Sequence, residues 1–404
     1  MKKIVKPFYN PISLPVNQIK MIFAFTKLLS WKKLFSWGIQ SPKLFTTAAG
    51  STGIGCFGYP SHPVFELTNN CNLTCDGCHA NGGEDIYKEM TTIQAKKFIT
   101  ELAEIKEFRT LIFTGGEPFL RNDLYELIDY SKKIGFYPII ASNGTLMPEE
   151  TIKTIKKLGV TGVAISIDSI DPLKHDKSRG MNGCFDEVIR TIDRLKNNGL
   201  YVQTNITMSR NNLNELEELI KFGDKLDSHV ILLYQFITTG RGKDKDDISL
   251  NSDEFMDLIK KTVDLQKDIK PVIAPIGLPE YWAYLFSQKN SINKSEKKFF
   301  SGCIAGKGMF YIKPNGDVWP CAFLPISAGN VLHEKPVDIW EKSEVFNNLR
   351  DRSKLKGICN NCEFAEVCGG CRARAYALTG DYLGEDSLCP IIKKNNLVFI
   401  RTSE

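Results

Sequence analysis

Residues 71–78 read Cys71-Asn-Leu-Thr-Cys75-Asp-Gly-Cys78 and follow directly on a β-rich run at residues 64–68. Three thiolates within eight residues can wrap one corner of a cube of iron and sulfide and leave one iron without a protein ligand. Zinc would need four ligands, and the nearest further candidate, His79, stands beside Cys78, where it could not easily turn back to the same ion. Three cysteines this close rarely all pack as buried apolar groups. The stretch therefore predicts an iron–sulfur site at the end of a strand.

Six short β-rich runs alternate with helical patterns between residues 63 and 267. Between the runs, apolar residues recur at three-to-four spacing, as in Phe98, Leu102 and Ile105. This alternation predicts an α/β fold with a parallel sheet, and six units suit a partial (β/α)6 TIM-type barrel better than a closed barrel of eight. Functional groups should collect where the strands end. The predicted strands are residues 64–68, 110–114, 136–142, 162–167, 201–207 and 230–236.

Glycines and small polar residues stand at these strand ends. Gly115-Gly116-Glu117-Pro118 follows the second run; paired glycines let the backbone approach a ligand closely, and the carboxylate can accept a hydrogen bond from an ammonium group. A tight turn after any strand could look the same. The other polar residues could contact a ribose, or they could serve turns and helix N-caps. They are Ser142, Asn143, Ser166, Asp168 and Asn205.

A second group of seven cysteines lies between residues 303 and 389, and seven is an awkward number for disulfides. Two Cys-x-x-Cys pairs could enclose zinc, but that arrangement would leave the other three cysteines without a role. The seven are Cys303, Cys321, Cys359, Cys362, Cys368, Cys371 and Cys389. The remaining Cys56 and Cys184 match no motif and are most simply core thiols.

The first cysteine run, reinforced by residues 115–118, resembles the cluster motif of the radical S-adenosylmethionine (SAM) superfamily, and the second group resembles the SPASM domain. The resemblance covers about residues 63–390. It implies a [4Fe-4S] cluster on Cys71, Cys75 and Cys78 whose open iron binds the methionyl amine and carboxylate of SAM. A reduced cluster of this kind cleaves SAM, and the 5′-deoxyadenosyl radical abstracts hydrogen from a substrate. The resemblance also implies a low-potential electron donor such as flavodoxin or ferredoxin.

The same resemblance assigns further residues. Residues 115–118 would grip the methionyl amine, and Arg179 resembles an arginine that pairs with the methionyl carboxylate, although it could equally be a solvated loop charge. Two auxiliary [4Fe-4S] clusters are implied, and the second lacks a fourth cysteine. Cys359, Cys362, Cys368 and Cys389 would hold one, and Cys303, Cys321 and Cys371 the other.

The chain departs from the family pattern at three places. Gly77 stands where many members carry an aromatic residue near the adenine, so adenine contacts are expected from elsewhere. Two residues rather than three separate Cys368 from Cys371, which is expected to alter the nearer cluster. Sulfatase-maturing relatives carry an acidic base where this chain has Ala322, which argues against that activity.

Three hypotheses for the function remain open from the sequence. The first is a maturase that acts on a ribosomally made peptide or protein. The second is an enzyme that modifies tetrapyrrole side chains in an alternative haem pathway, where Arg241, Arg372 and Arg374 could pair with propionates, or with peptide carboxylates in the first case. Each of these arginines could instead be solvated at the surface. The third is a non-catalytic iron–sulfur electron carrier.

Charge and cysteine use bound the partners and the location. A net charge of +5 with dispersed Lys and Arg argues against nucleic acid. No cleavable secretory signal is evident, and clustered cysteines favour metal ligation in a reducing cytoplasm. The apolar and basic leader has charge-free runs too short to span a bilayer; it could pack over the next domain or lie on a membrane surface. The predicted parts are a helical leader (1–60), a radical SAM barrel (61–270), a linker (271–301), a SPASM-like domain (302–392) and a tail (393–404).

Overall fold

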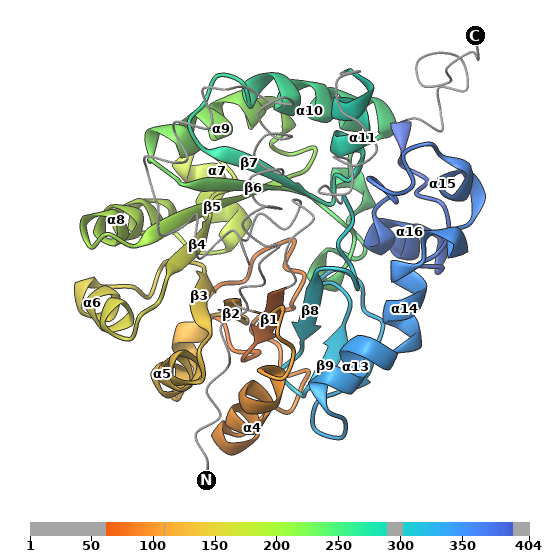
Figure 1. Cartoon of the computed structure of the whole chain (residues 1–404). Helices are drawn as coiled ribbons and strands as arrows, with labels where there is room; N and C mark the ends of the chain where they lie inside the picture. Colours follow the sequence, from red (N-terminus) through yellow and green to blue (C-terminus); the bar gives the residue numbers. More distant parts are fainter. Residues whose placement is uncertain (1–61, 109, 289–301, 391–404) are drawn as a thin grey trace.

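The computed structural model describes residues 62–108, 110–288 and 302–390, in which helices surround a curved sheet (Figure 1). Within these residues ten strands form one sheet in the order β10-β9-β8-β1-β2-β3-β4-β5-β6-β7. The strands from β8 through β1 to β7 run parallel to one another, whereas β9 pairs antiparallel with both β8 and β10. The prediction of an α/β fold with a parallel, barrel-like sheet is confirmed. The predicted leader and tail lie outside the described residues.

The strands are β1 (His62–Glu66), β2 (Thr110–Thr114), β3 (Tyr137–Ser142), β4 (Gly162–Ser166), β5 (Tyr201–Met208), β6 (Val230–Gln235), β7 (Val272–Ile276), β8 (Met309–Ile312), β9 (Asp317–Trp319) and β10 (Gly329–Asn330). The barrel helices are α4 (Thr92–Leu102), α5 (Leu124–Ile134), α6 (Glu149–Lys157), α7 (Pro172–Arg179), α8 (Cys184–Asn197), α9 (Leu216–Lys225), α10 (Ser252–Leu265) and α11 (Glu280–Ser287). The C-terminal helices are α13 (Pro336–Lys342), α14 (Glu344–Arg350), α15 (Gly357–Asn361) and α16 (Arg372–Thr379).

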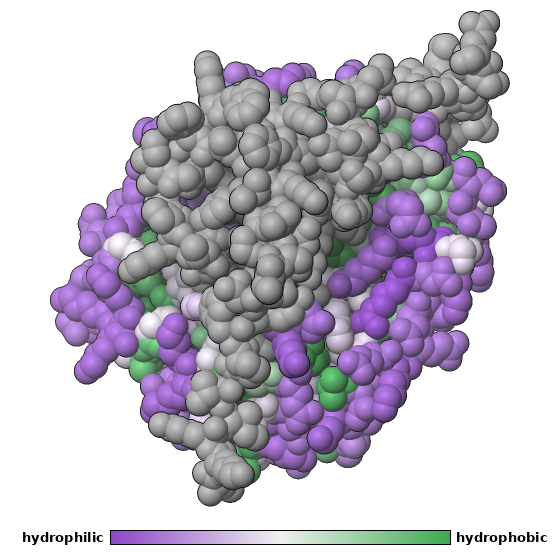
Figure 2. All heavy atoms as spheres, in the orientation of Figure 1, coloured by the Kyte–Doolittle hydropathy of each residue, from purple (hydrophilic) through white to green (hydrophobic). Residues whose placement is uncertain are grey.

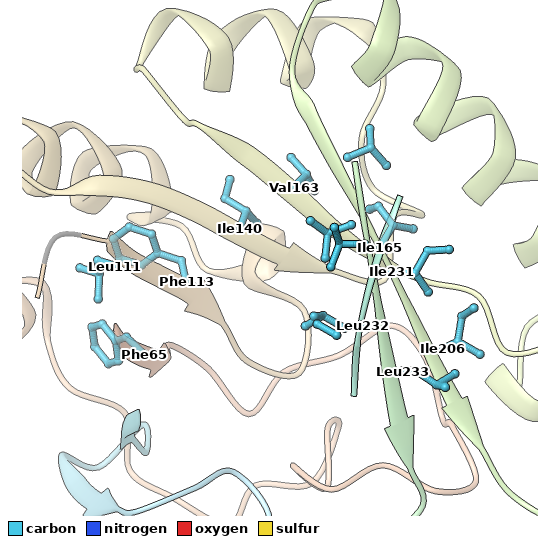
Figure 3. Packing of buried hydrophobic residues seen from close by; sticks show 14 of the residues in the cluster. Phe65, Leu111, Phe113, Ile140, Val163, Ile165, Ile206, Ile231, Leu232 and Leu233 are labelled. Atoms are coloured by element: carbon cyan, nitrogen blue, oxygen red, sulfur yellow. The ribbon is translucent and has the colours of Figure 1, made fainter. Parts of the chain in front are cut away.

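A continuous apolar layer between the sheet and the outer helices forms the core (Figure 3). Phe65 of β1 packs edge-on against Phe98 of α4, with ring centroids 5.2 Å apart. As expected from the spacing, Phe98, Leu102 and Ile105 are all buried. Each fully buried side chain of this size stabilises the fold by roughly 1.5–3 kcal/mol.

Three of the outer helices, α4, α7 and α10, begin at a side-chain cap. Helix α4 starts at a capping box, in which the Thr91 side chain accepts from the backbone N–H of Gln94 while the Gln94 side chain accepts from the N–H of Thr91. On the face shown in Figure 2, hydrophilic side chains cover most of the coloured surface and hydrophobic ones form small patches. Within the described residues no helix combines the length and apolarity needed to cross a bilayer.

The linker prediction for residues 271–301 is corrected by β7 and α11. Strand β7 pairs with β6, with Pro275 opposite Leu233, and four of its five residues are buried. The prolines here look like interruptions because proline removes a hydrogen-bond donor from a strand. In the observed order β7 is the last strand, and an end strand tolerates proline because only one side of it has to pair.

The C-terminal segment continues the barrel sheet. Strand β8 runs parallel to β1, with Tyr311 opposite Val64. Glu66, at the end of β1, is fully buried and accepts hydrogen bonds from Lys313 Nζ at 2.6 Å and Tyr311 Oη at 2.7 Å. Because breaking a buried ion pair is costly, this contact holds residues 302–390 against the first strand.

Candidate functional site

The three cysteines of the first run lie in the loop that leaves the C-terminal end of β1, and all three are half-buried free thiols. The backbone N–H of Leu73 donates to Cys71 Sγ at 3.4 Å, and that of Gly82 donates to Cys78 Sγ at 3.3 Å. Burial raises the pKa of Cys71 to about 11, and the nearby charges of Glu117, Cys75 and Cys78 add to the rise. The loop thus gathers three thiols, and a nearby cation would favour the thiolate form of Cys71.

The paired glycines after β2 allow the two loops at this edge of the sheet to pass closely. A Cβ atom on Gly115 would lie 2.8 Å from the carbonyl oxygen of Thr68, and one on Gly116 would lie 2.3 Å from that of Asn70. The backbone N–H of Gly116 donates to the Thr68 carbonyl at 2.8 Å, and that of Glu117 to Asn70 at 2.7 Å. The close backbone approach expected toward a ligand is therefore made to the cysteine loop, which these bonds fasten to β2.

Glu117 is the buried acceptor at the centre of this edge. Its Oε1 accepts from Ser142 Oγ at 2.9 Å and its Oε2 from the backbone N–H of Asn143 at 2.8 Å. Pro118 begins the 3-10 turn Pro118–Leu120 that Glu117 caps. Burial raises the pKa of Glu117 to about 7. The structure brings residues 115–118, Ser142 and Asn143 together, and a cationic group at Glu117 would favour its ionised form.

Arg179 lies beside Cys75 rather than in solvent. Its Nη2 forms an ion pair with Asp168 Oδ2 at 2.5 Å, and its Nη1 donates to Cys75 Sγ at 3.8 Å. Its side chain is 14% exposed, so the reading as a solvated loop charge is wrong. Its Nε is buried without a hydrogen-bond partner. Asp168 also accepts from the backbone N–H of Thr207 at 2.7 Å, which ties α7 to β5.

Ser166 and Asn205 lie next to each other on neighbouring strands. They are register partners at the C-terminal half of β4 and β5, and both are half-buried. The Asn205 side chain accepts from Gln203 Nε2 at 2.9 Å. Two residues further along the chain from each of them, Asp168 accepts from the backbone N–H of Thr207, so Ser166 and Asn205 precede the contact that holds Asp168.

Two residues that sequence reasoning missed or misplaced support the cysteine loop. A Cβ on Gly77 would lie 3.0 Å from Phe236 Cε2, so the ring of Phe236, which follows β6, fills the place beside Gly77. Arg241 donates to the carbonyls of Cys75 at 2.8 Å and Gly82 at 2.6 Å, a contact with the cysteine loop that the sequence did not predict. The sequence contained one indication of the Phe236 contact, because Gly77 stands where many family members carry an aromatic residue.

In the C-terminal segment the thiols interact electrostatically in two sets. The pKa of Cys368 is raised by burial and by the nearby groups Glu280, Cys389 and Cys359. Burial and the Cys359 thiol likewise raise the pKa of Cys362. Separately, Cys303 contributes to the raised pKa values of Cys321, which reaches about 12 mainly through burial, and of Cys371. The resemblance implies the same partition. The sets are Cys359, Cys362, Cys368 and Cys389, and Cys303, Cys321 and Cys371.

The residues present fit iron–sulfur clusters. All eleven cysteines of the described residues are free thiols. Within those residues no three His, Cys, Asp or Glu side chains converge in the way that a single metal ion requires. A four-iron cluster does not need such convergence, because each thiolate binds a different iron. Cys184, which matches no motif, is 1% exposed in the core, and Cys56 lies outside the described residues.

Arg372 and Arg374 are not available to a substrate. They are 0% and 4% exposed. Arg374 donates to Asp386 Oδ2 at 2.6 Å, Glu280 Oε1 at 2.9 Å and Gln235 Oε1 at 2.9 Å. The expectation that these arginines pair with propionates or peptide carboxylates is therefore corrected: both are committed to protein groups.

Comparisons with known proteins agree with this geometry. Residues 65–223 match the radical SAM superfamily, and residues 303–363 match SPASM, an iron–sulfur cluster-binding domain. The AdoMet-dependent heme synthase of Methanosarcina barkeri is 35% identical over 81% of this chain and 95% of its own length. The antilisterial bacteriocin subtilosin biosynthesis protein AlbA of Bacillus subtilis is 26% identical over 92% of this chain and 79% of its own length.

A solved structure shares the fold. Streptococcus suis SuiB bound to precursor peptide SuiA superposes with a TM-score of 0.66 and 20% identity, over 85% of this chain and 79% of that one. The family matches support [4Fe-4S] clusters over the alternative hypothesis of zinc at the two cysteine groups. In the radical SAM superfamily such a cluster acts together with SAM. The chain belongs to the radical SAM superfamily and is an enzyme of that family with a SPASM domain at its C-terminal end.

Proposed function

We propose that this enzyme modifies the side chains of a tetrapyrrole, in the manner of a haem synthase. The observation that carries the proposal is the 35% identity to the AdoMet-dependent heme synthase of Methanosarcina barkeri, which extends over 95% of that protein. The match is long enough to include both cysteine regions. Membership of an enzyme family sets aside the reading as a non-catalytic electron carrier.

The residues of the chain divide the work as follows. Cys71, Cys75 and Cys78 hold the [4Fe-4S] cluster, which supplies the electron that cleaves SAM to a 5′-deoxyadenosyl radical. Glu117 would accept a hydrogen bond from the methionyl ammonium group. The three hydrogen bonds that Glu117 already accepts hold its own carboxylate in place. Arg179 would pair with the methionyl carboxylate through its buried, unpartnered Nε, while its Nη2 is held by Asp168.

The C-terminal thiols extend the site. Cys359, Cys362, Cys368 and Cys389 hold one auxiliary cluster and Cys303, Cys321 and Cys371 hold the other, whose remaining iron is open to another residue or to the substrate. The electrostatic partition of the thiols supports this assignment. Oxidation of a substrate radical requires an electron acceptor, and the auxiliary clusters can provide one. A reduced flavodoxin or ferredoxin would deliver electrons to the first cluster.

Titration of the anaerobically reconstituted full chain with an iron porphyrin tests the substrate. We expect a shift of the Soret band at micromolar porphyrin and SAM-dependent formation of 5′-deoxyadenosine that increases when the porphyrin is present. The matched control is the same porphyrin with esterified carboxylates, which should bind more weakly. An unchanged spectrum together with unstimulated cleavage would remove the tetrapyrrole proposal.

A second candidate, a peptide maturase, is favoured by one specific observation. The match to the subtilosin biosynthesis protein leaves only 8% of the chain, about 32 residues, uncovered, so it includes part of the 60-residue leader. This candidate predicts that a short peptide encoded beside the gene stimulates SAM cleavage and changes in mass when incubated with the reduced enzyme. A neighbourhood without such a peptide would count against it.

A further inference from the structure

The turn between Cys368 and Cys371 makes room for two buried arginines. Gly369 and Gly370 adopt φ angles of +70° and +61°, which side chains rarely allow. A Cβ on Gly369 would lie 2.5 Å from Cζ of Arg352, and one on Gly370 would lie 2.4 Å from Nη2 of Arg372. Each glycine of this shortened turn therefore lies directly against one guanidinium group.

Arg372 points its charge at a thiol of the four-cysteine set. It is 0% exposed, and its Nη2 donates to Cys359 Sγ at 3.7 Å. Its other donors reach main-chain carbonyls, including that of Gly384 at 2.6 Å. Among the described residues it forms no ion pair with a carboxylate: Asp386, whose pKa it helps to lower, is ion-paired with Arg374 instead.

Arg352 is the second of these arginines, and it contacts the main chain of Cys303 in the three-cysteine set. It is 4% exposed, and its Nη2 donates to the carbonyl of Cys303 at 2.9 Å. Its Nε and Nη1 are buried without a hydrogen-bond partner, and it too lacks a carboxylate partner within the part of the chain that the structure describes. A buried guanidinium cannot lose its proton, so a negative group has to balance it.

We propose that Arg372 and Arg352 are redox-tuning residues, each the fixed positive charge that faces one auxiliary cluster. This inference rests on the proposed assignment of the two thiol sets. A cluster that accepts one electron becomes more negative by one charge, and a nearby fixed cation favours that change. By contrast, Arg179 at the first cluster is neutralised by Asp168. The auxiliary clusters are therefore easier to reduce than they would be without these charges, as acceptors of substrate electrons require.

The test is an EPR-monitored redox titration of the reconstituted full chain in its wild-type form and as Arg372→Met, Arg372→Lys and Arg352→Met. We expect each Met variant to lower the midpoint potential of one auxiliary cluster only, by at least tenfold in the reduction equilibrium, or about 59 mV for one electron. Arg372→Lys keeps the charge and should stay near the wild-type potential. Arg190→Met, which removes an arginine 56% exposed on α8, is the control and should change no potential.

The outcomes distinguish an effect of the arginine charge from an effect of its shape. They also distinguish failure of this inference from failure of the proposed function. Loss of about four irons in Arg372→Met but not in Arg372→Lys also supports a charge that balances the cluster. Unchanged potentials in both Met variants with full iron content, or a Lys variant that behaves like Met, would overturn the inference. Wild-type protein with only about four irons per chain would instead overturn the assignment of the auxiliary clusters in the proposed function.

Discussion

At the scale of single residues, the chemistry depends on three thiols within eight positions. Replacement of Cys75 by Ala removes one of the proposed iron ligands, so we expect the iron content to fall by about four of twelve and 5′-deoxyadenosine formation to disappear. Iron analysis and product chromatography measure these effects. Cys184→Ala is the matched control: this buried thiol touches His175 in the core, so its loss should reduce stability by ~1 kcal/mol and leave the iron unchanged. Radical chemistry that survives Cys75→Ala would contradict the cluster assignment.

Glu117 should make the stability of the cluster-free protein depend on pH. Its pKa rises from 4.5 to about 7 because of burial, so the unfolded chain releases this proton first as pH rises. The contribution of Glu117 is therefore complete below pH 4.5 and is lost as pH rises toward 7, by about 3 kcal/mol in total.

Thermal unfolding of wild type and Glu117→Gln between pH 5 and 8 checks this prediction. The variant should lose less stability across this range than the wild type, because its side chain cannot ionise. The affinity for SAM should also fall by roughly tenfold or more in the variant, since a charge-assisted hydrogen bond is lost. Parallel pH profiles for the two proteins would contradict the assigned pKa.

At the scale of elements, the loops that follow different strands support one another. The ring of Phe236, after β6, lies between Gly77 of the cysteine loop and Gly242, where a Cβ would lie 2.8 Å from Cζ. Gly77→Phe alone should collide with this ring and weaken SAM binding. The double variant Gly77→Phe, Phe236→Ala moves the aromatic ring to the cysteine loop and should recover binding, as measured by the SAM-induced change in the EPR signal. A double variant that binds SAM more weakly than either single variant would show that an aromatic ring at position 77 cannot replace the ring of Phe236.

At the scale of the whole molecule, Arg374 connects the C-terminal segment to the barrel. From α16 it contacts Gln235 of β6, Glu280 of α11 and Asp386, and Asp386 also accepts from the backbone N–H of Cys371 at 2.7 Å. Arg374→Met leaves these buried partners unpaired, so we expect a loss of about 3–5 kcal/mol in the free energy of unfolding. Urea denaturation measures it. Lys356→Met, which breaks an exposed pair with Asp381, should cost less than ~1 kcal/mol.

Sequence periodicity predicted the barrel well where strand and helix signals are local. Strand β7 escaped because Pro275 looks like a break, and only its place at the end of the sheet explains why proline is tolerated there. The gathering of Ser142 and Asn143 on Glu117 followed from the rule that parallel strands end at one edge. Arg372 and Arg374 were misjudged because a charged side chain in a polar stretch gives no sign of whether the fold will bury it.

The sequence by itself determined that three thiols lie together in one short loop, because the spacing of residues within a loop is set by the covalent chain. Only the tertiary structure decided which charges face which thiols. Arg372 meets Cys359, and Arg352 meets the carbonyl of Cys303 and the turn at Gly369, through packing of segments far apart in the chain. Such contacts depend on how helices and turns pack as a whole, and no local pattern encodes them.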